Sequence, residues 1–309
     1  MLNKRFNIEN FISFELGGHV FDVATFCKNK FGKELTKKII EKTGPKKLFI
    51  CDKNSDTLDL SLKAWEKINN KIDINKIQNL IYVTETNLYQ YPGNGYLFAS
   101  NTKLSENLRV YDLNSGCTGF VEALILANGL SGNSLIICSE AYSKNINKFD
   151  RSISTLFSDC ATIFYFDKKI FSVNEHFSLI KKNSYNDLRK KNNESMKMYG
   201  LNVFSFVNTR VNQGINNFLG NYKIKYSINE MYIHQASKVV VDYFKKKTEY
   251  KDLRIPANIC EIGNTVSSSL PMLMLHDREN LNKDEKKFIF LCGFGVGLGC
   301  TGLILSIKK

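Results

Sequence analysis

The sequence predicts an α/β protein built from two related halves around buried β-sheets. Apolar strand-like runs alternate with helical runs along the chain, which is the order typical of sheets covered by helices. A faint internal repeat indicates that the second half copies the order of the first. With 309 residues, 43% of them apolar, the chain is long enough to bury a substantial core.

Several segments of the first half carry clear signals. Residues 56–68 have helical spacing of apolar side chains, and residues 77–86 predict a buried strand with a polar end. Residues 109–113, RVYDL, predict a second strand. The run GFVEALILANGL at 119–130 predicts a helix closed by glycine, and NSLIICSEA at 133–141 predicts the strand that follows.

The internal repeat links these segments to the second half. Residues 74–87 resemble residues 224–237 in their Ile, Asn and apolar positions. A small-residue turn and a helix follow each, first NSGCTGFVEAL and then IGNTVSSSLPMLM, and a strand comes next in both halves. We place the boundary at residue 168, which gives halves of residues 1–168 and 169–309. No Pro/Gly/Ser linker separates them, so we expect one shared core.

Cysteine usage and the N-terminus predict a cytoplasmic protein. The eight cysteines contain no C-x-x-C pair, which is poor spacing for a zinc site or a disulfide scaffold. Most lie in apolar runs, where cysteine packs as a small hydrophobe. The first residues lack the apolar region of a signal peptide, and runs such as FIFLC are too short to cross a bilayer.

The formal charge of +13 points to acidic partners, although a general bias toward Lys explains part of it. Basic clusters such as FKKK at 244–247 lack the interleaved aromatic residues of a groove for single-stranded nucleic acid. We therefore expect no nucleic acid, and an acidic protein partner remains open.

One cysteine differs from the rest, because it lies between a strand and a helix in YDLNSGCTGFVEALI (111–125). The helix would direct its N–H groups and the positive end of its dipole at the sulfur of Cys117, which favours the thiolate. Gly116, Thr118 and Gly119 leave room for a substrate. A thiolate attacks a thioester readily and leaves again from one. The alternative is that Cys117 only fills space in the core.

Three further motifs are candidates for the same chemistry. His234 ends an apolar strand in MYIHQAS, and Asn264 follows a glycine at a turn in IGNTVSSSLP. The glycine run at 293–302, GFGVGLGCTG, can bring backbone N–H groups close to a ligand. Each has a plainer alternative, namely a core histidine, turn chemistry, and a tight bend or phosphate loop. The run fits neither the dinucleotide fingerprint nor the Walker pattern.

Together these motifs resemble the β-ketoacyl-acyl-carrier-protein synthase III family of the thiolase-like superfamily. The resemblance covers most of the chain and rests on DLNSGCTGFVEAL, HQASKVVVDYFKKK, GNTVSSSLP and GFGVGLG, which occur in the family's order. It implies a five-layered α-β-α-β-α fold from two duplicated halves, usually a homodimer. It also implies an acyltransferase without a cofactor, whose substrates are thioesters of coenzyme A or acyl carrier protein.

The resemblance also assigns roles to residues of this chain. Cys117 looks like the nucleophile that accepts the acyl group, with the backbone N–H groups of Cys117 and Val296 as the oxyanion hole. His234 and Asn264 look like the two donors that hold the enolate formed when a malonyl thioester loses carbon dioxide. The carbanion then attacks the acyl group on Cys117, which is a decarboxylative Claisen condensation.

Other positions concern the substrates. Arg151, Lys246 and Lys247 match basic positions that contact coenzyme A or the acidic carrier protein. Tyr91 and Phe294 are expected at the acyl pocket, which the family shapes partly with a residue from across the dimer.

Departures from the family pattern predict a divergent member. Lys38 and Lys42 replace the aromatic residue and the arginine with which many members grip coenzyme A, and SDCAT at 158–162 replaces a glycine-rich stretch. These changes suggest specialised acyl-chain or surface-saccharide biosynthesis.

Three other functions are alternatives to condensation. The nearest keeps the fold and moves the acyl group from Cys117 to an alcohol or amine. A papain-like hydrolase has Cys, His and Asn in the same order, but its cysteine lies near the N-terminus in a signature that this sequence lacks. Only the net charge supports a nucleic-acid-binding protein.

Overall fold

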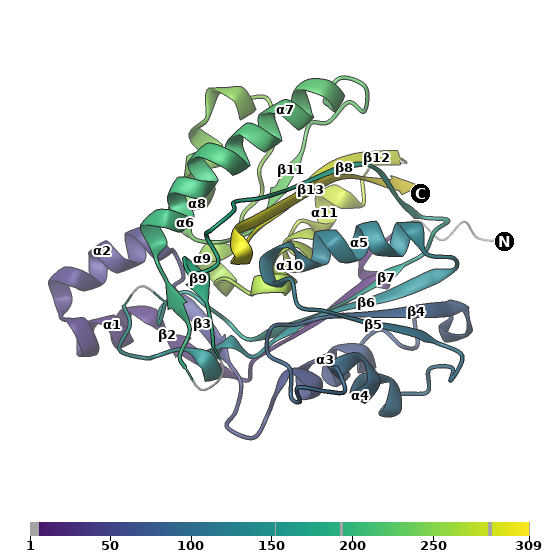
Figure 1. Cartoon of the computed structure of the whole chain (residues 1–309), viewed down its shortest axis with the longest axis horizontal. Coiled ribbons are helices and arrows are strands. Elements are labelled where there is room, and N and C mark those ends of the chain that lie inside the picture. The colour runs from purple at the N-terminus through teal and green to yellow at the C-terminus, as the bar shows by residue number, and fades with distance from the viewer. Residues whose placement is uncertain (1–5, 152, 192–193, 284–285, 309) are drawn as a thin grey trace.

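The computed structural model describes residues 6–151, 153–191, 194–283 and 286–308 (Figure 1). Its first half forms a five-stranded sheet in the order β1-β7-β6-β4-β5. β7 is antiparallel to β1 and β6, whereas β4 is parallel to β6 and β5. The strands are β1 (Ile12–Leu16), β4 (Ile77–Val83), β5 (Arg109–Leu113), β6 (Asn133–Glu140) and β7 (Cys160–Phe166).

The second half repeats this order in a four-stranded sheet, β8-β13-β12-β11. β13 is antiparallel to β8 and β12, and β12 is parallel to β11. The strands are β8 (Phe171–Ile180), β11 (Met231–Ile233), β12 (Lys286–Gly295) and β13 (Gly299–Lys308). The shared order and directions confirm two duplicated halves. The expected boundary at residue 168 falls in the turn between β7 and β8.

Helices fill three layers around the two sheets (Figure 1). α5 packs against β4 and β6 on one side and against β8, β12 and β13 on the other, and α10 packs against β1, β7 and β11. α3 and α4 cover the outer face of the first sheet, and α6, α7 and α8 cover the second. The helices are α3 (Thr57–Glu66), α4 (Asn94–Ser100), α5 (Gly119–Gly129), α6 (Gly200–Phe206), α7 (Asn212–Tyr222), α8 (Lys238–Lys246), α9 (Ile259–Ile262), α10 (Ser269–His276) and α11 (Arg278–Leu281).

The two central helices are apolar on nearly all sides because both of their faces are buried. In α5 the buried residues are Gly119, Phe120, Val121, Ala123, Leu124 and Ala127. In α10 seven residues in a row are buried, from Ser269 to Leu275. The predicted helix at 119–130 and strand at 133–141 are therefore confirmed as α5 and β6. The strand predicted at 77–86 is shorter, because β4 ends at Val83.

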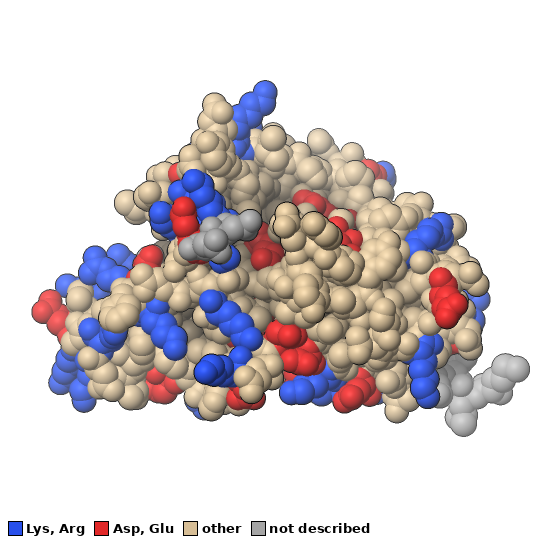
Figure 2. All heavy atoms as spheres, turned by 60° about the horizontal axis from the view of Figure 1, so that its bottom comes forward, with Lys and Arg blue, Asp and Glu red and all other residues tan. Residues whose placement is uncertain are grey.

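A small subdomain projects from one end of the molecule (Figure 1). It contains the hairpin of β2 (His19–Asp22) and β3 (Lys47–Ile50) and the helices α1 (Val23–Phe31) and α2 (Lys33–Thr43), of which α2 packs against α8. Residues 23–43 hold six lysines and two glutamates. Figure 2 shows Lys and Arg side chains gathered at this end.

A second hairpin, β9 (Leu188–Arg189) and β10 (Lys197–Met198), precedes α6. In the part of the chain that the structure describes, no helix is long and apolar enough to span a membrane.

Candidate active site

Cys117 lies in a 3₁₀ turn, η3 (Gly116–Thr118), that leads directly into α5. Gly116 has φ of +46°, a left-handed conformation that favours glycine. The backbone N–H groups of Cys117 and Val296 lie within hydrogen-bonding reach of Sγ. Val296 begins the 3₁₀ turn η8 (Val296–Leu298), which joins β12 to β13. The glycine run therefore brings a backbone N–H to the sulfur, as the sequence indicated.

Two glycines of β12 make this approach possible. A Cβ on Gly295 would lie 2.9 Å from Sγ of Cys117, and a Cβ on Gly293 would lie 2.5 Å from its carbonyl oxygen. Side chains at these positions would push β12 away from η3. The absence of Cβ atoms here thus keeps the two halves of the chain in contact at the sulfur.

His234 follows β11 and is fully buried. Its backbone N–H donates to the carbonyl of Cys292 at 2.9 Å, and its ring meets Phe294 edge-on with centroids 5.6 Å apart. Burial lowers the pKa of His234 to about 3, so the imidazole is neutral at physiological pH. Nδ1 has no hydrogen-bond partner among the described residues. The ring is held by backbone and packing contacts.

Asn264 is oriented by hydrogen bonds on both ends of its amide. Oδ1 accepts from the N–H of Val266 at 2.8 Å, and Nδ2 donates to the carbonyl of Ala236 at 3.2 Å. Val266 begins a 3₁₀ turn, η7 (Val266–Ser268), which packs against η3. Nδ2 has two N–H groups, so one remains for a ligand oxygen.

Cys117 and His234 both contact the glycine run, and Asn264 is bonded to the segment after His234. Gly295 contacts Cys117, the neighbouring Phe294 contacts His234, and Ala236 links the segment after His234 to Asn264. Cys117, Val266 and Phe294 belong to one buried cluster, with Ala236 and Val296 packed against it. The segments that carry the thiol, the neutral imidazole and the carboxamide therefore pack against one buried cluster.

The expectation of a thiolate is wrong for the site as it stands. Burial raises the pKa of the Cys117 thiol well above its usual value, and the charges of Glu85 and Glu140 raise it further. The N–H groups of Cys117 and Val296 act in the opposite direction but are outweighed. The sequence indicated the helix start and gave no sign of these carboxylates.

Glu85 and Glu140 are functional candidates that the sequence reasoning missed. Glu140 is completely buried and accepts from Ser267 Oγ at 2.9 Å, Thr86 Oγ1 at 3.1 Å and the N–H of Glu85 at 3.1 Å. Burial and the charge of Glu85 raise its pKa to about 8. The sequence does carry a signal for this pair, because TET follows β4 and SEAY ends and follows β6. The carboxyl ends of neighbouring parallel strands meet at one edge of the sheet.

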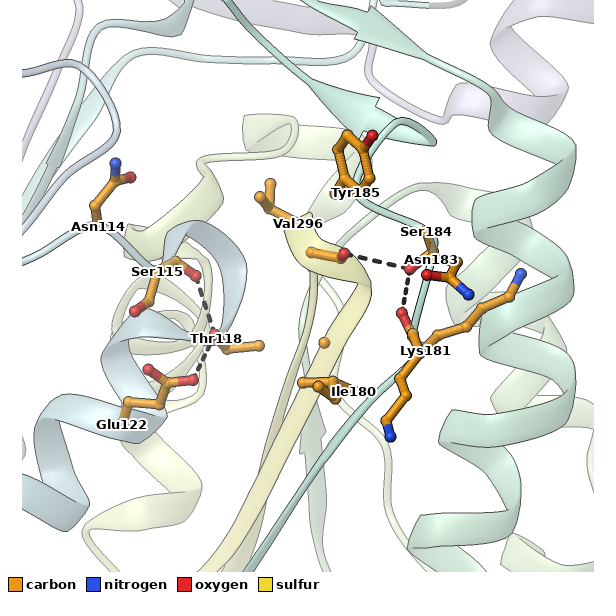
Figure 3. Close-up of a pocket in the computed structure, with 13 residues that line it drawn as sticks. Asn114, Ser115, Thr118, Glu122, Ile180, Lys181, Asn183, Ser184, Tyr185 and Val296 are labelled. Atoms are coloured by element: carbon orange, nitrogen blue, oxygen red, sulfur yellow. Dashed lines mark hydrogen bonds between the residues drawn. The ribbon is translucent and has the colours of Figure 1, made fainter.

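A pocket of about 390 Å³ opens beside the cysteine turn. Figure 3 shows Ser115, Thr118 and Glu122 on one side of it and the loop after β8 on the other, with Val296 between them. Thr118 Oγ1 donates to Glu122 at 2.9 Å. The full lining is Asn114, Ser115, Thr118, Glu122, Ile180, Lys181, Lys182, Asn183, Ser184, Tyr185, Val296, Gly297 and Gly299.

The two residues expected at the acyl pocket do not line this space. Tyr91 is 81% exposed, in the loop before α4, whereas Phe294 is buried against His234. The structure of one chain does not bring them together.

The three basic residues predicted to contact coenzyme A or the carrier protein are not enclosed in the core. Arg151 and Lys246 are exposed, and Lys246 ends α8. Lys247 is partly buried, with Nζ 4.8 Å from the centroid of the Tyr243 ring. α8 packs against α2, the helix that carries Lys38, and Gly44 at the end of α2 meets Lys238 at the start of α8.

Comparisons with known proteins agree with this architecture. The family model described as 3-oxoacyl-[acyl-carrier-protein (ACP)] synthase III matches residues 111–182, and its C-terminal counterpart matches residues 224–307. The β-ketoacyl-[acyl-carrier-protein] synthase III of Streptococcus agalactiae is 29% identical over 295 residues, 87% of this chain and 90% of that protein. The synthase of that name from Campylobacter jejuni is 29% identical over 290 residues, 87% of this chain and 88% of that protein.

Solved structures give the fold. The 3-oxoacyl-(acyl carrier protein) synthase III of Pseudomonas aeruginosa superposes with a TM-score of 0.84 at 21% identity, covering 97% of each chain. The 3-oxoacyl-(acyl-carrier protein) synthase of Burkholderia xenovorans gives 0.84 at 23% identity, covering 96% of this chain and 93% of that one. The five layers and two duplicated sheets are those of the thiolase-like fold. Within that class, the chain is a divergent member of the β-ketoacyl-acyl-carrier-protein synthase III family.

Proposed function

We propose that this chain condenses an acyl group held on Cys117 with a malonyl thioester, releasing carbon dioxide. One observation carries the proposal: Cys117 and His234 contact the same glycine run, whose Val296 N–H acts on the sulfur, and Asn264 is bonded to Ala236 just after His234. A thiol that only filled core space would need neither a backbone donor directed at it nor an imidazole on the same glycine run.

In the first step, Sγ of Cys117 attacks the carbonyl carbon of the primer thioester and the carrier thiol leaves. The N–H groups of Cys117 and Val296 would stabilise the oxyanion, and a donor preset at such an oxygen contributes about 3 kcal/mol. Their position at Sγ supports this role, because the carbonyl carbon bonded to the sulfur carries its oxygen into the same region.

In the second step, the malonyl thioester loses carbon dioxide and leaves an enolate. The neutral imidazole of His234 and the Nδ2 amide of Asn264 would each donate a hydrogen bond to the enolate oxygen. Neutral donors suit this task because they stabilise the developing charge without delivering a proton to the carbanion. The carbanion then attacks the acyl carbon, and Cys117 leaves as the β-ketoacyl thioester forms. An enzyme with this mechanism is an acyltransferase that uses no cofactor.

The partner and the assembly are part of the same proposal. An acidic acyl carrier protein would dock at the end where α2 and α8 meet, attracted by Lys246, Lys247 and their neighbours. We expect a homodimer in which exposed Tyr91 meets the other copy. The free cysteines suit the reducing cytoplasm.

Intact mass after exposure to a panel of acyl thioesters tests the first step, and release of labelled carbon dioxide from malonyl carrier protein tests the second. Cys117→Ala should lose acylation and, with it, formation of the β-ketoacyl product. Asn264→Ala should keep acylation and lose condensation by about 100-fold or more, because its amide acts only on the enolate. Equal loss of both steps in Asn264→Ala would contradict this role. Acyl transfer to an alcohol or amine without carbon dioxide would favour the rival function.

A further inference from the structure

The carboxylate of Glu85 lies against the turn that carries Cys117. A Cβ placed on Gly116 would be 2.6 Å from Oε2 of Glu85, so only a glycine before Cys117 admits the carboxylate there. Glu85 is the charged group with the largest effect on the Cys117 thiol. A negative charge beside a nucleophile that must lose a proton is unfavourable unless it takes part in the reaction.

Tyr142 joins Glu85 to the same cluster. Its hydroxyl donates to Oε2 of Glu85, and its ring packs on Phe157 with centroids 5.1 Å apart. Tyr142 and Cys117 belong to one buried cluster and act on each other electrostatically. The backbone N–H of Glu85 is held by Glu140. The carboxylate of Glu85 is thus held by Tyr142 against Gly116, the residue before Cys117.

His234 is poorly suited to take the thiol proton. Its pKa of about 3 makes the imidazole a very weak base. Burial instead raises the pKa of the Glu85 carboxyl, which makes it a stronger base than an exposed glutamate. Glu140 also acts on the Cys117 thiol, but its carboxylate already accepts from Ser267, Thr86 and the N–H of Glu85. Glu85 lies against the turn that carries the sulfur.

Building on the proposed function, we propose that Glu85 is the proton acceptor of Cys117 during acylation. The S–H proton passes to the Glu85 carboxylate as Sγ forms its bond to the acyl carbon. The bond from that carbon to the carrier sulfur breaks, and the carrier thiolate takes the proton from Glu85 to leave as a thiol. Glu85 returns to the carboxylate, and no other reactant is needed.

If Glu85 acted only through its charge, removing it would change the acylation rate of Cys117 in the opposite direction. If the carboxylate acts only as a nearby negative charge, its removal lowers the pKa of the Cys117 thiol and speeds every reaction of the sulfur. If the carboxylate accepts the proton, its removal slows acyl transfer even though the thiolate forms more easily.

The test measures two rates on the same variants between pH 5 and 9. One is acylation of Cys117 by the acetyl and hexanoyl thioesters of N-acetylcysteamine, followed by intact mass. The other is alkylation of Cys117 by iodoacetamide, which requires the thiolate and no protein base. The variants are Glu85→Gln, Glu85→Asp and Tyr142→Phe. The control is Asp112→Asn, the same kind of change on β5, where the carboxylate accepts from the N–H of Gly95.

We expect Glu85→Gln to acylate about 100-fold more slowly while its alkylation is unchanged or faster. The limb of the pH profile that reports ionisation of Glu85 should disappear. Glu85→Asp should recover part of the rate, Tyr142→Phe should shift the limb, and Asp112→Asn should match the wild type.

A rise of both rates in Glu85→Gln, or an acylation rate equal to that of the wild type, would overturn the role of Glu85 and leave the proposed condensation standing. A fall of both rates in Glu85→Gln and Glu85→Asp alike, with a lower Tm, would show a structural role and also overturn it. A wild-type enzyme that neither thioester acylates would count against both proposals, whereas loss of condensation by pre-acylated wild type would count against the proposed function alone.

Discussion

Burial gives individual side chains of this site properties that their residue types do not have in water. His234 is neutral because its imidazole is enclosed, and Glu140 is a weak acid for the same reason. These shifts make stability depend on pH in opposite directions. Burial of a neutral histidine makes the free energy of unfolding fall as pH falls, because the unfolded state binds the proton more tightly. Burial of a protonated carboxyl makes it fall as pH rises.

The effect of His234 can be isolated by substitution. Its pKa is about 3 in the folded protein and 6.5 when exposed, so its contribution is complete above pH 6.5 and is lost as pH falls toward 3. Relative to His234→Gln, the wild type should lose about 1.4 kcal/mol of unfolding free energy per pH unit below 6.5. Urea denaturation between pH 4.5 and 7.5 measures this difference, with the exposed His176→Gln as control. Parallel curves for His234→Gln and the wild type would contradict the buried, neutral state.

At the scale of elements, α7 offers two glycines in contrasting surroundings. A Cβ on Gly214 would lie 2.7 Å from Leu179 and 3.0 Å from Phe177 of β8, whereas Gly220 has nothing within 4 Å. Gly220→Ala should therefore raise the free energy of unfolding by up to about 1 kcal/mol through helix propensity. Gly214→Ala should lower it by about 1 kcal/mol or more, because overpacking against β8 outweighs the same gain. Chemical denaturation of both variants checks the pair, and equal shifts would mean that α7 does not lie this close to β8.

The same scale shows what the sequence could and could not predict. The predictions locate α5 and β6 almost to the residue, because a glycine-closed apolar helix and a strand built on the apolar run LIIC have clear patterns. Short motifs predict the candidate residues: Cys117 and Asn264 at turns before helices, and His234 at the end of an apolar strand. Glu85 and Glu140 are not predicted, because their proximity arises only when β4 and β6 pair in parallel. The sequence also misled about the protonation state of Cys117, because burial raises the pKa of its thiol and the two carboxylates add to this effect.

At the scale of the whole molecule, the uneven charge matters more than its total. The net charge of +13 includes the lysine-rich pair α1 and α2 at one end, beside α8. Charge gathered at one end orients an acidic partner as it approaches, whereas the same charge spread evenly would only raise the encounter rate. The proposed carrier site is therefore best tested by making the same charge change at two different positions.

The test reverses one charge in each of two separate variants, at Lys246 and at Lys103. Lys246→Glu, at the end of α8, should raise KM for acyl carrier protein substrates about 3-fold at low salt and leave kcat unchanged, because it weakens encounter without touching the site. The effect should fade as salt approaches about 0.5 M. KM for small N-acetylcysteamine thioesters should not change. The control is Lys103→Glu, between α4 and β5, which makes an equal change of net charge elsewhere. An equal rise in KM in that variant would show that the carrier responds to total charge and does not dock beside α8.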